Sequence, residues 1–460
     1  MAELEIVSPH DGAHLAHIPT DDASSIDRKV GAAAAAMSEW SARSPMARAE
    51  VLLAIAEATR REFPRLAREL SLEQGKTVKE ALLELDRYVG PYVQYAGLAT
   101  AVAGRHVRLS PGVEGIVERR PVGVVAGVVP WNFPASLFGS KVAPALAAGC
   151  GFLIKPAEST SLITLELARL ANEHLPEGLL DVVIGDSEVA AHLVGHPGVT
   201  RVAFTGSTAV GKSIAINAGS SFKRLSLELG GCDPFVVCED ADLPRAVRAL
   251  MGTRFYNAGQ VCVAPKRLIA HRSVIDEVTA MLTERIGRIV VGPSDDETAT
   301  MGPLHTSASR DKLEAQIDDA VAHGATLIGG GRPDTERTQR GWFMSPALLV
   351  EPSGTARVRV EETFGPVLTV LGFESLDEAV GLANETTYGL GASVWSGDHD
   401  TAWSLAHRIE SGYTWINALG RVYDELPFGG VKASGVGREH GVEALDSYLE
   451  DHTYVIGNAV

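Results

Sequence analysis

The clearest indication of the fold lies in residues 122–155, which read VGVVAGVVPWNFPASLFGSKVAPALAAGCGFLIK. The run at 122–129 is rich in valine and stops at a proline, as expected for a buried strand. Residues 135–148 have the length and apolar content of a helix, and residues 152–155 form a second, short strand-like run. A strand, a helix and another strand in this order are typical of a parallel sheet covered by helices, so the segment predicts an α/β protein.

The same alternation extends along most of the chain on either side of this segment. Apolar spacing predicts further helices at residues 27–40, 46–72, 78–103, 162–174, 189–194, 274–288, 310–322 and 401–409. Further strands are expected at residues 115–120, 180–184, 201–205, 234–238, 267–271, 367–373, 392–395, 413–417 and 448–456. Two α/β domains accommodate these strands better than one very large sheet, and we expect the division near the Gly230-Gly231 pair.

The overall composition is that of a soluble globular protein. The chain has 460 residues, of which 45% are hydrophobic and 22% charged, and this length allows about three domains. Lysine and arginine number 41 and aspartate and glutamate 58, which gives a net charge of −17. An acidic chain without a block of basic residues is not expected to bind nucleic acid or anionic membranes.

The sequence shows no targeting, disulfide or metal-binding pattern. The opening MAELEIVSPH lacks the features of a secretory signal, and the longest nearly apolar run, 142–154, is too short to span a bilayer. The four cysteines show no CxxC spacing, so we expect a cytoplasmic chain without disulfides or bound metal. Five histidines are expected to be exposed to solvent: His10, His14 and His17 in a mobile N-terminal segment, and His192 and His196.

Residues 206–213, GSTAVGKS, match the GxxxxGK[ST] pattern of nucleoside triphosphatases. They follow the strand expected at 201–205 and precede a helix, and residues 235–240 resemble the metal-binding strand of such enzymes. A glycine-rich turn at a helix N-terminus stabilises any phosphate, including the pyrophosphate of a dinucleotide. The pattern alone therefore leaves a nucleoside triphosphatase and a dinucleotide-binding enzyme both open.

Six further segments place polar or reactive residues among glycines and prolines. They are PWNFP at 130–134, KPAE at 155–158, ELGG at 228–231, GQVC at 259–262, EETFGP at 361–366 and PFGGVKASG at 427–435. Taken singly, each has an ordinary explanation: Cys262 as a buried small side chain, Glu228 as a surface carboxylate and Asn132 as a turn former. The six segments are more informative together.

In this order, the segments resemble the aldehyde dehydrogenase superfamily over essentially the whole chain. Glu228 and Cys262 are 34 residues apart, as in the main branch of that family. The family's FTGST segment, here residues 204–208, opens a helix that faces a dinucleotide pyrophosphate, so we interpret the ending Lys212-Ser213 as coincidence. The sequence has no GxGxxG, which suits a family whose Rossmann-like domain binds the dinucleotide without it.

The resemblance implies an α/β fold with a Rossmann-like dinucleotide-binding domain, an α/β catalytic domain and a small β oligomerisation element. The dinucleotide-binding domain is expected at residues 1–104 and 122–230, the catalytic domain at 231–434, and the oligomerisation element at 105–121 and 435–460. Because an open strand edge is an aggregation hazard, a homodimer or homotetramer is expected.

The residue types fit the oxidation of an aldehyde to a carboxylic acid. A planar aldehyde is a poor hydride donor, whereas its tetrahedral adduct with a thiolate can expel hydride, which makes Cys262 the expected nucleophile. The resemblance assigns the oxyanion to the Asn132 amide and the Cys262 backbone N–H. Glu228 is expected to deprotonate the water that hydrolyses the thioester. Lys141 completes the expected catalytic set as a supporting residue.

The resemblance also implies a set of residues that contact NAD. The set is Trp131, Lys155, Glu158, Ser207, Gly231, Glu362 and Phe364. Lys155 and Glu158 would bind the adenosine ribose. Ser207 would lie at the pyrophosphate, and Glu362 would hold the nicotinamide ribose. Because a carboxylate at Glu158 repels a 2′-phosphate, NAD is expected to be preferred to NADP.

The aldehyde pocket implied by position is mostly apolar and suits an aliphatic or aromatic tail. Its expected lining is Phe133, Leu137, Ser140, Tyr256, Val261, Val263, Arg421, Val422 and Phe428. Succinate-semialdehyde dehydrogenases commonly have arginine where Ser140 stands, so the usual anchor for that substrate is missing. Arg421 is either a carboxylate anchor at the pocket mouth or a solvated loop residue, and Asn417 is a further candidate at the substrate end.

Three rival interpretations are kept. A nucleoside triphosphatase would depend on Lys212 and magnesium, and a non-enzymatic relative would be expected to lack the Cys262 thiol. A CoA-acylating dehydrogenase shares the nucleophile but commonly lacks the glutamate at position 228. The presence of Glu228 therefore favours water as the acyl acceptor.

Overall fold

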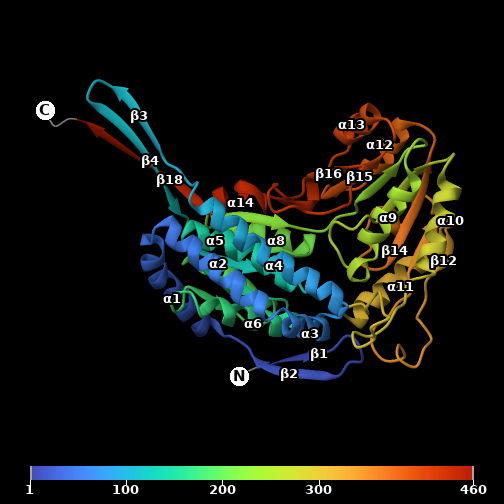
Figure 1. The fold of residues 1–460 in the computed structure, drawn as a ribbon, viewed down its shortest axis with the longest axis horizontal. Coiled ribbons are helices and arrows are strands. Elements are labelled where there is room, and N and C mark those ends of the chain that lie inside the picture. Colours follow the sequence, from blue (N-terminus) through green and yellow to red (C-terminus); the bar gives the residue numbers. More distant parts are fainter. Residues whose placement is uncertain (1–2, 458–460) are drawn as a thin grey trace.

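A computed structural model describes residues 3–457 and contains two largely parallel sheets flanked by helices (Figure 1). The α/β architecture predicted from residues 122–155 is confirmed. The expected domain ranges start at residue 1 and end at residue 460, so residues 1–2 and 458–460 of those ranges lie outside the described chain.

The first sheet has six strands in the order β17-β9-β8-β5-β6-β7. Its strands are β5 (Val124–Val128), β6 (Gly151–Lys155), β7 (Leu180–Val182), β8 (Val199–Thr205), β9 (Arg224–Glu228) and β17 (Gly435–Val436). All neighbours are parallel except β17, which runs antiparallel to β9. Helices α5 (Pro134–Ala148), α6 (Ser161–Asn172), α7 (Ser187–Gly195) and α8 (Thr208–Gly219) connect the strands. The chain runs from β5 to β6 and β7 on one side and continues at β8 on the other, so the strand order reverses between β5 and β8.

The second sheet has seven strands in the order β12-β13-β14-β11-β10-β15-β16. These are β10 (Pro234–Val237), β11 (Arg267–His271), β12 (Thr326–Gly329), β13 (Ala347–Val350), β14 (Val367–Phe373), β15 (Gly391–Trp395) and β16 (Tyr413–Ile416). Its helices are α9 (Leu243–Arg254), α10 (Ile275–Ile286), α11 (Ser307–Ala322), α12 (Leu376–Asn384) and α13 (His399–Arg408). The central strands β11 and β14 have the bounds expected from the sequence, and all but one of their residues are buried.

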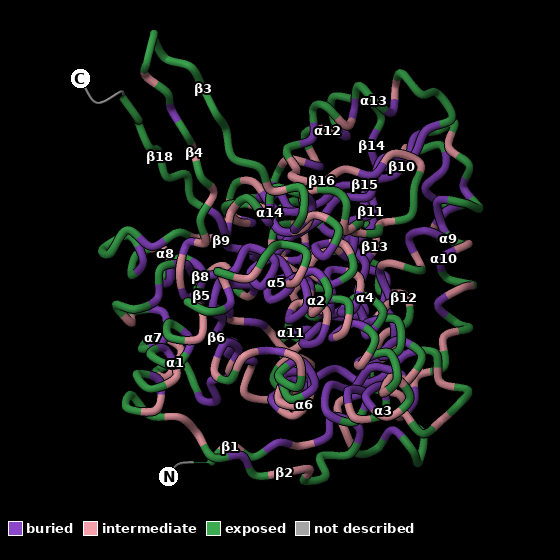
Figure 2. Tube along the Cα trace, turned by 60° about the vertical axis from the view of Figure 1, so that its left-hand side comes forward, coloured by how far each residue is buried: buried purple, intermediate pink, exposed green. Residues whose placement is uncertain are grey.

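A three-stranded arm projects from the first sheet's side of the molecule (Figure 1). It consists of β3 (Arg105–Ser110), β4 (Val113–Pro121) and β18 (Leu449–Gly457), with β4 in the middle. Figure 2 shows the arm as mostly exposed, and every residue of β3 is exposed. Of the range 435–460, β18 belongs to this arm, whereas β17 joins the first sheet and α14 (Gly441–Ser447) packs on α5.

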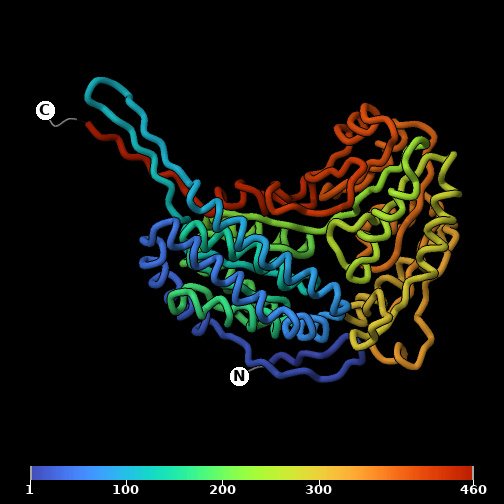
Figure 3. The backbone as a smooth tube through the Cα atoms, in the orientation of Figure 1, coloured from blue at the N-terminus to red at the C-terminus, as the bar shows by residue number. Residues whose placement is uncertain are grey.

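The N-terminal segment is an ordered hairpin, not the mobile segment expected from the sequence. Strands β1 (Glu3–Val7) and β2 (His14–Pro19) pair antiparallel and run along one side of the molecule, as the blue trace in Figure 3 shows. The expectation that His10 is exposed is wrong, because its ring is buried and its Nε2 lies 2.9 Å from the Ser71 carbonyl oxygen. His14, His17 and His192 are exposed, and His196 is half-buried.

Four N-terminal helices lie on the first sheet's side of the molecule. They are α1 (Ala23–Ala42), α2 (Pro45–Arg61), α3 (Phe63–Gln74) and α4 (Val78–Ala99). Helix α1 packs on the strands of that sheet, and the other three pack on α5 and α6. The single helix expected at 46–72 is two helices, because Pro64 fits only in the first turn of α3.

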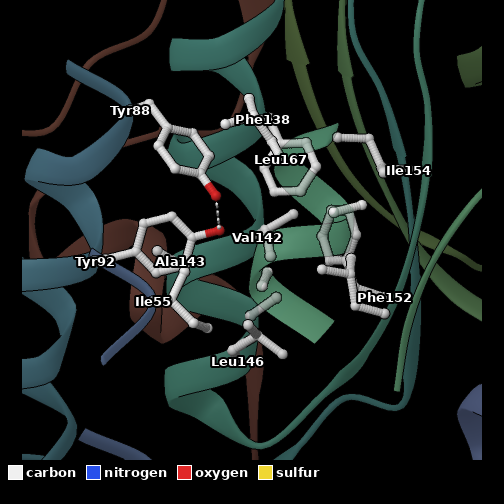
Figure 4. Close-up of a cluster of buried hydrophobic side chains, with 14 of the residues drawn as sticks. Ile55, Tyr88, Tyr92, Phe138, Val142, Ala143, Leu146, Phe152, Ile154 and Leu167 are labelled. Atoms are coloured by element: carbon white, nitrogen blue, oxygen red, sulfur yellow. Dashed lines mark hydrogen bonds between the residues drawn. The ribbon is translucent and has the colours of Figure 1, made fainter. Parts of the chain in front are cut away.

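The packing of α4 on α5 forms the core behind the site described below. Gly139 of α5 lies directly against the Tyr88 carbonyl, where a Cβ would clash, so the two helices approach closely. Figure 4 shows the buried side chains of this region, among them Ile55, Tyr88, Tyr92, Phe138, Val142, Leu146 and Phe152. The Tyr88 hydroxyl donates to that of Tyr92 at 3.2 Å, which satisfies a polar group in an otherwise apolar layer.

None of the helices described between residues 3 and 457 combines the length and apolar character needed to cross a membrane. In the same range, no group of three or more histidine, cysteine, aspartate or glutamate side chains is placed to hold a metal ion.

Candidate active site

The carboxyl ends of β5, β8 and β9 open into a cavity of about 370 Å³. Its other wall comes from α11 and from the segments that lead into β11 and β14. Most residues singled out from the sequence line it: Trp131, Asn132, Phe133, Leu137, Ser140, Ser207, Glu228, Val261, Cys262, Val263, Glu362, Phe364, Val422 and Phe428. The β5/β8 boundary, where the strand order reverses, is the place at which open parallel sheets bind their ligands.

Cys262 lies half-buried on the cavity wall, directly after a strained turn. In η2 (Tyr256–Gly259), Asn257 and Ala258 both have a φ of +52°, a left-handed conformation that is costly for residues with a side chain. Burial raises the pKa of the Cys262 thiol to about 12, while the charge of Lys266 acts in the opposite direction. The thiol is therefore protonated in the resting enzyme, and it must lose this proton before the sulfur can act as a nucleophile.

Asn132 is tied to the loop that carries Cys262. It follows β5 and is buried, and its Nδ2 donates to the Gln260 carbonyl oxygen at 3.0 Å. The backbone carbonyl oxygen of Asn132 accepts from Lys76 Nζ and from Asn257 Nδ2, each at 2.9 Å. These contacts fix both the backbone and the carboxamide of Asn132 at the part of the cavity wall next to Cys262.

Glu228 is the last residue of β9 and is 3% exposed. Neither of its carboxylate oxygens has a hydrogen-bond partner among the described residues. Burial raises the pKa of Glu228 well above its usual value, and Glu439 adds to the effect, while Lys141 and Arg438 oppose it. A buried carboxyl group without partners, at the wall of a cavity, is a strong candidate for an acid–base residue.

Lys141 lies behind the wall and connects three polar groups. Its Nζ donates to Thr205 Oγ1 at 2.7 Å and pairs with the carboxylate of Glu439. Glu439 also accepts from Ser140 Oγ at 3.2 Å. The sequence analysis missed Glu439, whose partners lie 298 and 299 residues away.

The end of the cavity near α8 carries the residues expected to face a dinucleotide. Ser207 is the N-cap of α8, where its hydroxyl accepts from the Val210 N–H. Glu362 accepts from the Gly231 N–H at 3.1 Å, which places Gly231 directly behind the wall. Phe364 meets the face of Trp131 edge-on, with 5.6 Å between the ring centroids.

Trp131 stacks on a buried histidine that the sequence analysis did not single out. The rings of Trp131 and His305 lie 4.5 Å apart at an angle of 14°. Burial lowers the pKa of His305 to about 4, so the ring is neutral. Its Nδ1 faces the Gln74 carbonyl at 2.9 Å and must donate, which leaves Nε2 to accept from Ser159 Oγ at 2.6 Å.

Lys155 and Glu158 lie outside the cavity wall, next to β5. Lys155 ends β6, and its Nζ pairs with Glu158 Oε1 at 2.7 Å. Lys155 is buried, whereas the side chain of Glu158 is 46% exposed and remains accessible to a ligand.

The opposite end of the cavity is mostly apolar, with a polar rim. Phe133 on the wall stacks on Tyr256 behind it, with ring centroids 5.7 Å apart. The polar residues of the wall that were not singled out from the sequence include Arg87, Asp424 and His440. Asp424 Oδ1 lies 2.9 Å from His440 Nδ1.

Three residues expected at the substrate end, Tyr256, Arg421 and Asn417, are not part of the wall formed by the described residues. Arg421 is exposed, and its guanidinium lies over the Tyr423 ring at 5.2 Å from the centroid. Asn417 bonds to the backbone N–H and carbonyl of Ser396 instead. The cation on the wall at this end is Arg87.

The position of the GxxxxGK[ST] match in the fold argues against a triphosphatase. Residues 206–213 do join β8 to α8, but residues 235–240 begin in β10, which belongs to the other sheet. In a triphosphatase the two strands act together on the phosphates and the metal. Lys212 is exposed on α8 and does not line the cavity.

The class of protein follows from the comparison with known families. The model of the aldehyde dehydrogenase family matches residues 2–454. The chain belongs to the aldehyde dehydrogenase family and is an enzyme that oxidises aldehydes to carboxylic acids.

Individual relatives agree with this assignment. Geranial dehydrogenase of Castellaniella defragrans is 40% identical over 447 residues, which cover 96% of this chain and 92% of the relative. Betaine aldehyde dehydrogenase of Staphylococcus aureus, solved with NAD+, is 34% identical with a TM-score of 0.96 over 100% of this chain and 92% of its own. An NADP-dependent enzyme of E. coli is equally similar, at 34% identity and a TM-score of 0.96 over 99% of this chain and 95% of its own.

Proposed function

We propose that this enzyme oxidises an apolar aldehyde with NAD, through a thioester on Cys262 that water hydrolyses. The observation that carries the proposal is one cavity whose wall holds Cys262, Asn132 and Glu228 together with Ser207 and Glu362. A thiol, an amide donor and a carboxylate supply the groups that acyl chemistry needs, and the second pair offers partners for a dinucleotide.

The residues present fit a nicotinamide dinucleotide. The N-terminus of α8 offers backbone N–H groups to a pyrophosphate, and the carboxylates of Glu158 and Glu362 can accept from ribose hydroxyls. Gly230 has no side chain to fill the space beside Glu362, since a Cβ there would lie 2.7 Å from Glu362 Oε2. When bound, the dinucleotide supplies the acceptor for the hydride that leaves the aldehyde carbon.

The first half of the mechanism belongs to Cys262 and Asn132. The thiol gives its proton to water, with Lys266 as the nearby charge that favours the thiolate, and the sulfur attacks the aldehyde carbon. The resulting oxyanion is stabilised by the Asn132 amide and the Cys262 backbone N–H. Loss of hydride from this adduct leaves a thioester on Cys262.

The second half belongs to Glu228. Its carboxylate takes a proton from water, which attacks the thioester and releases the acid. The free carboxylate oxygens support this role, because a carboxylate held by strong hydrogen bonds would be a weaker base. The same glutamate supports water as acyl acceptor over coenzyme A, the acceptor of a CoA-acylating dehydrogenase.

The cofactor preference is the first prediction. We expect kcat/KM to be at least about tenfold higher with NAD than with NADP, because Glu158 repels a 2′-phosphate that carries close to two negative charges. Glu158→Ser should narrow that ratio several-fold, whereas Glu188→Ser, at an exposed glutamate of α7, should leave it unchanged. A wild-type preference for NADP would contradict the role given to Glu158.

The substrate class is the second prediction. Neutral aldehydes of medium length, geranial among them, are expected to give a kcat/KM at least equal to that of succinate semialdehyde, because the wall at this end is mostly apolar. The name of the 40% identical relative supports this class. Arg421→Ala should not change the ratio of the two substrates, since Arg421 is exposed and stacks on Tyr423.

A panel of aldehydes that differ only in a terminal carboxylate tests this prediction in wild type, Arg421→Ala and Arg87→Ala. If the acidic aldehydes are preferred tenfold and Arg421→Ala abolishes the preference, Arg421 is the specificity residue and the apolar assignment fails. Loss of that preference in Arg87→Ala alone would assign it to the cation on the wall.

The arm supports the proposed oligomerisation element and a homodimer or homotetramer. Its strands expose apolar side chains that a second copy would cover: Val107, Leu109, Ile116, Val455 and Ile456. The domain ranges proposed from the sequence, 1–104 with 122–230 and 231–434, each contain one of the two large sheets apart from β17.

A further inference from the structure

A buried ion pair lies directly behind Asn132, outside the cavity wall. Lys76 precedes the N-cap of α4, Glu84 lies within that helix, and both side chains are 0% exposed and paired with each other. Burial lowers the pKa of Lys76, and Glu84 opposes this effect, so Glu84 helps to keep the ammonium charged. Two apolar residues would often fill such a site at least as stably, so a buried pair of this kind calls for a purpose other than stability.

Each member of the pair holds one side of the Asn132 loop. Lys76 Nζ donates to the Asn132 carbonyl oxygen at 2.9 Å and lies 4.2 Å from the centroid of the Phe133 ring. Glu84 Oε1 accepts from the N–H groups of Ala135 at 2.8 Å and Ser136 at 3.3 Å, in the first turn of α5. Phe133, the N-cap of α5, makes no side-chain capping bond within the described chain, so Glu84 takes the place of a cap.

The first turn of α4 also holds the loop that carries Cys262. Glu80 Oε1 accepts from the Asn257 N–H at 2.8 Å and so fixes a residue whose backbone is strained. Asn257 Nδ2 then donates to the same Asn132 carbonyl oxygen that accepts from Lys76. The start of α4 therefore connects the two loops that carry Asn132 and Cys262.

We propose that Lys76 and Glu84 are positioning residues for thioester formation, which act by fixing Asn132 relative to the Cys262 sulfur. The inference rests on the proposed function, in which the Asn132 amide stabilises the oxyanion. Such a donor is effective only if it already points to where charge develops, and a rotation of the 132–133 peptide would turn it away. Lys76 and Asn257 hold that peptide by its oxygen, and Glu84 holds the N–H groups that follow it.

The paired variant Lys76→Met/Glu84→Gln tests this role. It removes both charges, keeps side-chain length and leaves an amide oxygen that can accept from the Ala135 N–H. We expect the rate of the first NADH turnover to fall about 10- to 100-fold, while KM for the aldehyde changes less than about threefold. The rate of thioester hydrolysis should fall as well, because its tetrahedral intermediate places negative charge on the same oxygen. Lys79→Met, at an exposed lysine of the same helix, is the matched control and should change neither rate.

A double-mutant cycle separates positioning from a general structural role. If the pair acts through Asn132, the paired change should cost less than about threefold in an Asn132→Ala background. The same 10- to 100-fold loss in both backgrounds would overturn the inference, and so would an unchanged first turnover in the paired variant. If the paired variant does not fold, Glu84→Gln alone gives the same comparison with a smaller loss. Failure of the proposed function is distinguishable, because wild type itself would then form no NADH from aldehydes.

Discussion

Replacing Glu228 by glutamine is expected to leave one burst of NADH per active site, while steady-state turnover falls about 100- to 10,000-fold. The burst survives because thioester formation uses Cys262 and Asn132, whereas hydrolysis needs a base for the attacking water. Glutamine keeps the size of the side chain but cannot take the proton. Rapid-mixing absorbance of NADH, followed to steady state, separates the two phases.

The surroundings of Glu228 add a pH dependence to this step. Burial and Glu439 raise its pKa, so the carboxyl group is protonated, and inactive as a base, until the pH passes the raised value. The wild-type hydrolysis rate should therefore rise with pH through that range, and Glu228→Gln should lose this rise. Hydrolysis of the thioester after a single turnover, measured across pH, gives the comparison.

The control for Glu228→Gln is Cys262→Ala, which should show neither the burst nor turnover, because no thioester forms. Undiminished steady turnover in Glu228→Gln would remove this residue from hydrolysis. A burst that persists in Cys262→Ala would instead contradict the proposed nucleophile and, with it, the thioester.

The interior strands of both sheets could be predicted from the sequence because burial on two faces favours apolar side chains over most of their length. β11 and β14 illustrate this, with all but one of their residues buried. β3 was not predicted, because all of its residues are exposed and only two of them, Val107 and Leu109, give its sequence an apolar side. The hairpin of β1 and β2 was missed for a related reason, since few of its residues are buried.

Motif residues and their supports differ in the same way. Cys262, Glu228 and Asn132 were found because each lies in a short segment with glycine or proline beside it. Lys76, Glu84 and Glu439 belong to none of the six segments, and their roles follow from partners far along the chain. Lys76 meets Asn132 at a separation of 56 residues, and Lys141 meets Glu439 at 298. A single sequence specifies such pairs only through the completed fold.

Replacing Asn132 by alanine is expected to slow the first turnover about 100- to 1,000-fold, or roughly 3 to 4 kcal/mol in the barrier. The carboxamide is the side-chain donor assigned to the oxyanion, and the Cys262 backbone N–H alone remains in the variant. The rate of NADH formation in the first turnover reports the loss, and if thioester formation becomes slower than hydrolysis the burst disappears and the steady-state rate falls with it.

Asn132→Asp distinguishes this role from that of a turn former, the ordinary explanation of an asparagine between Trp131 and Phe133. Aspartate forms turns as readily, so a structural role predicts a burst rate close to that of wild type. As an oxyanion donor, however, aspartate is worse than alanine, because it donates no hydrogen bond and places a negative charge beside the developing one. The aspartate also loses the bond to the Gln260 carbonyl, so thermal unfolding of both variants must be compared. A burst rate that ranks asparagine first, alanine second and aspartate last, without a matching order in unfolding temperature, supports catalysis. Recovery of the burst in Asn132→Asp would leave the oxyanion without its proposed side-chain donor.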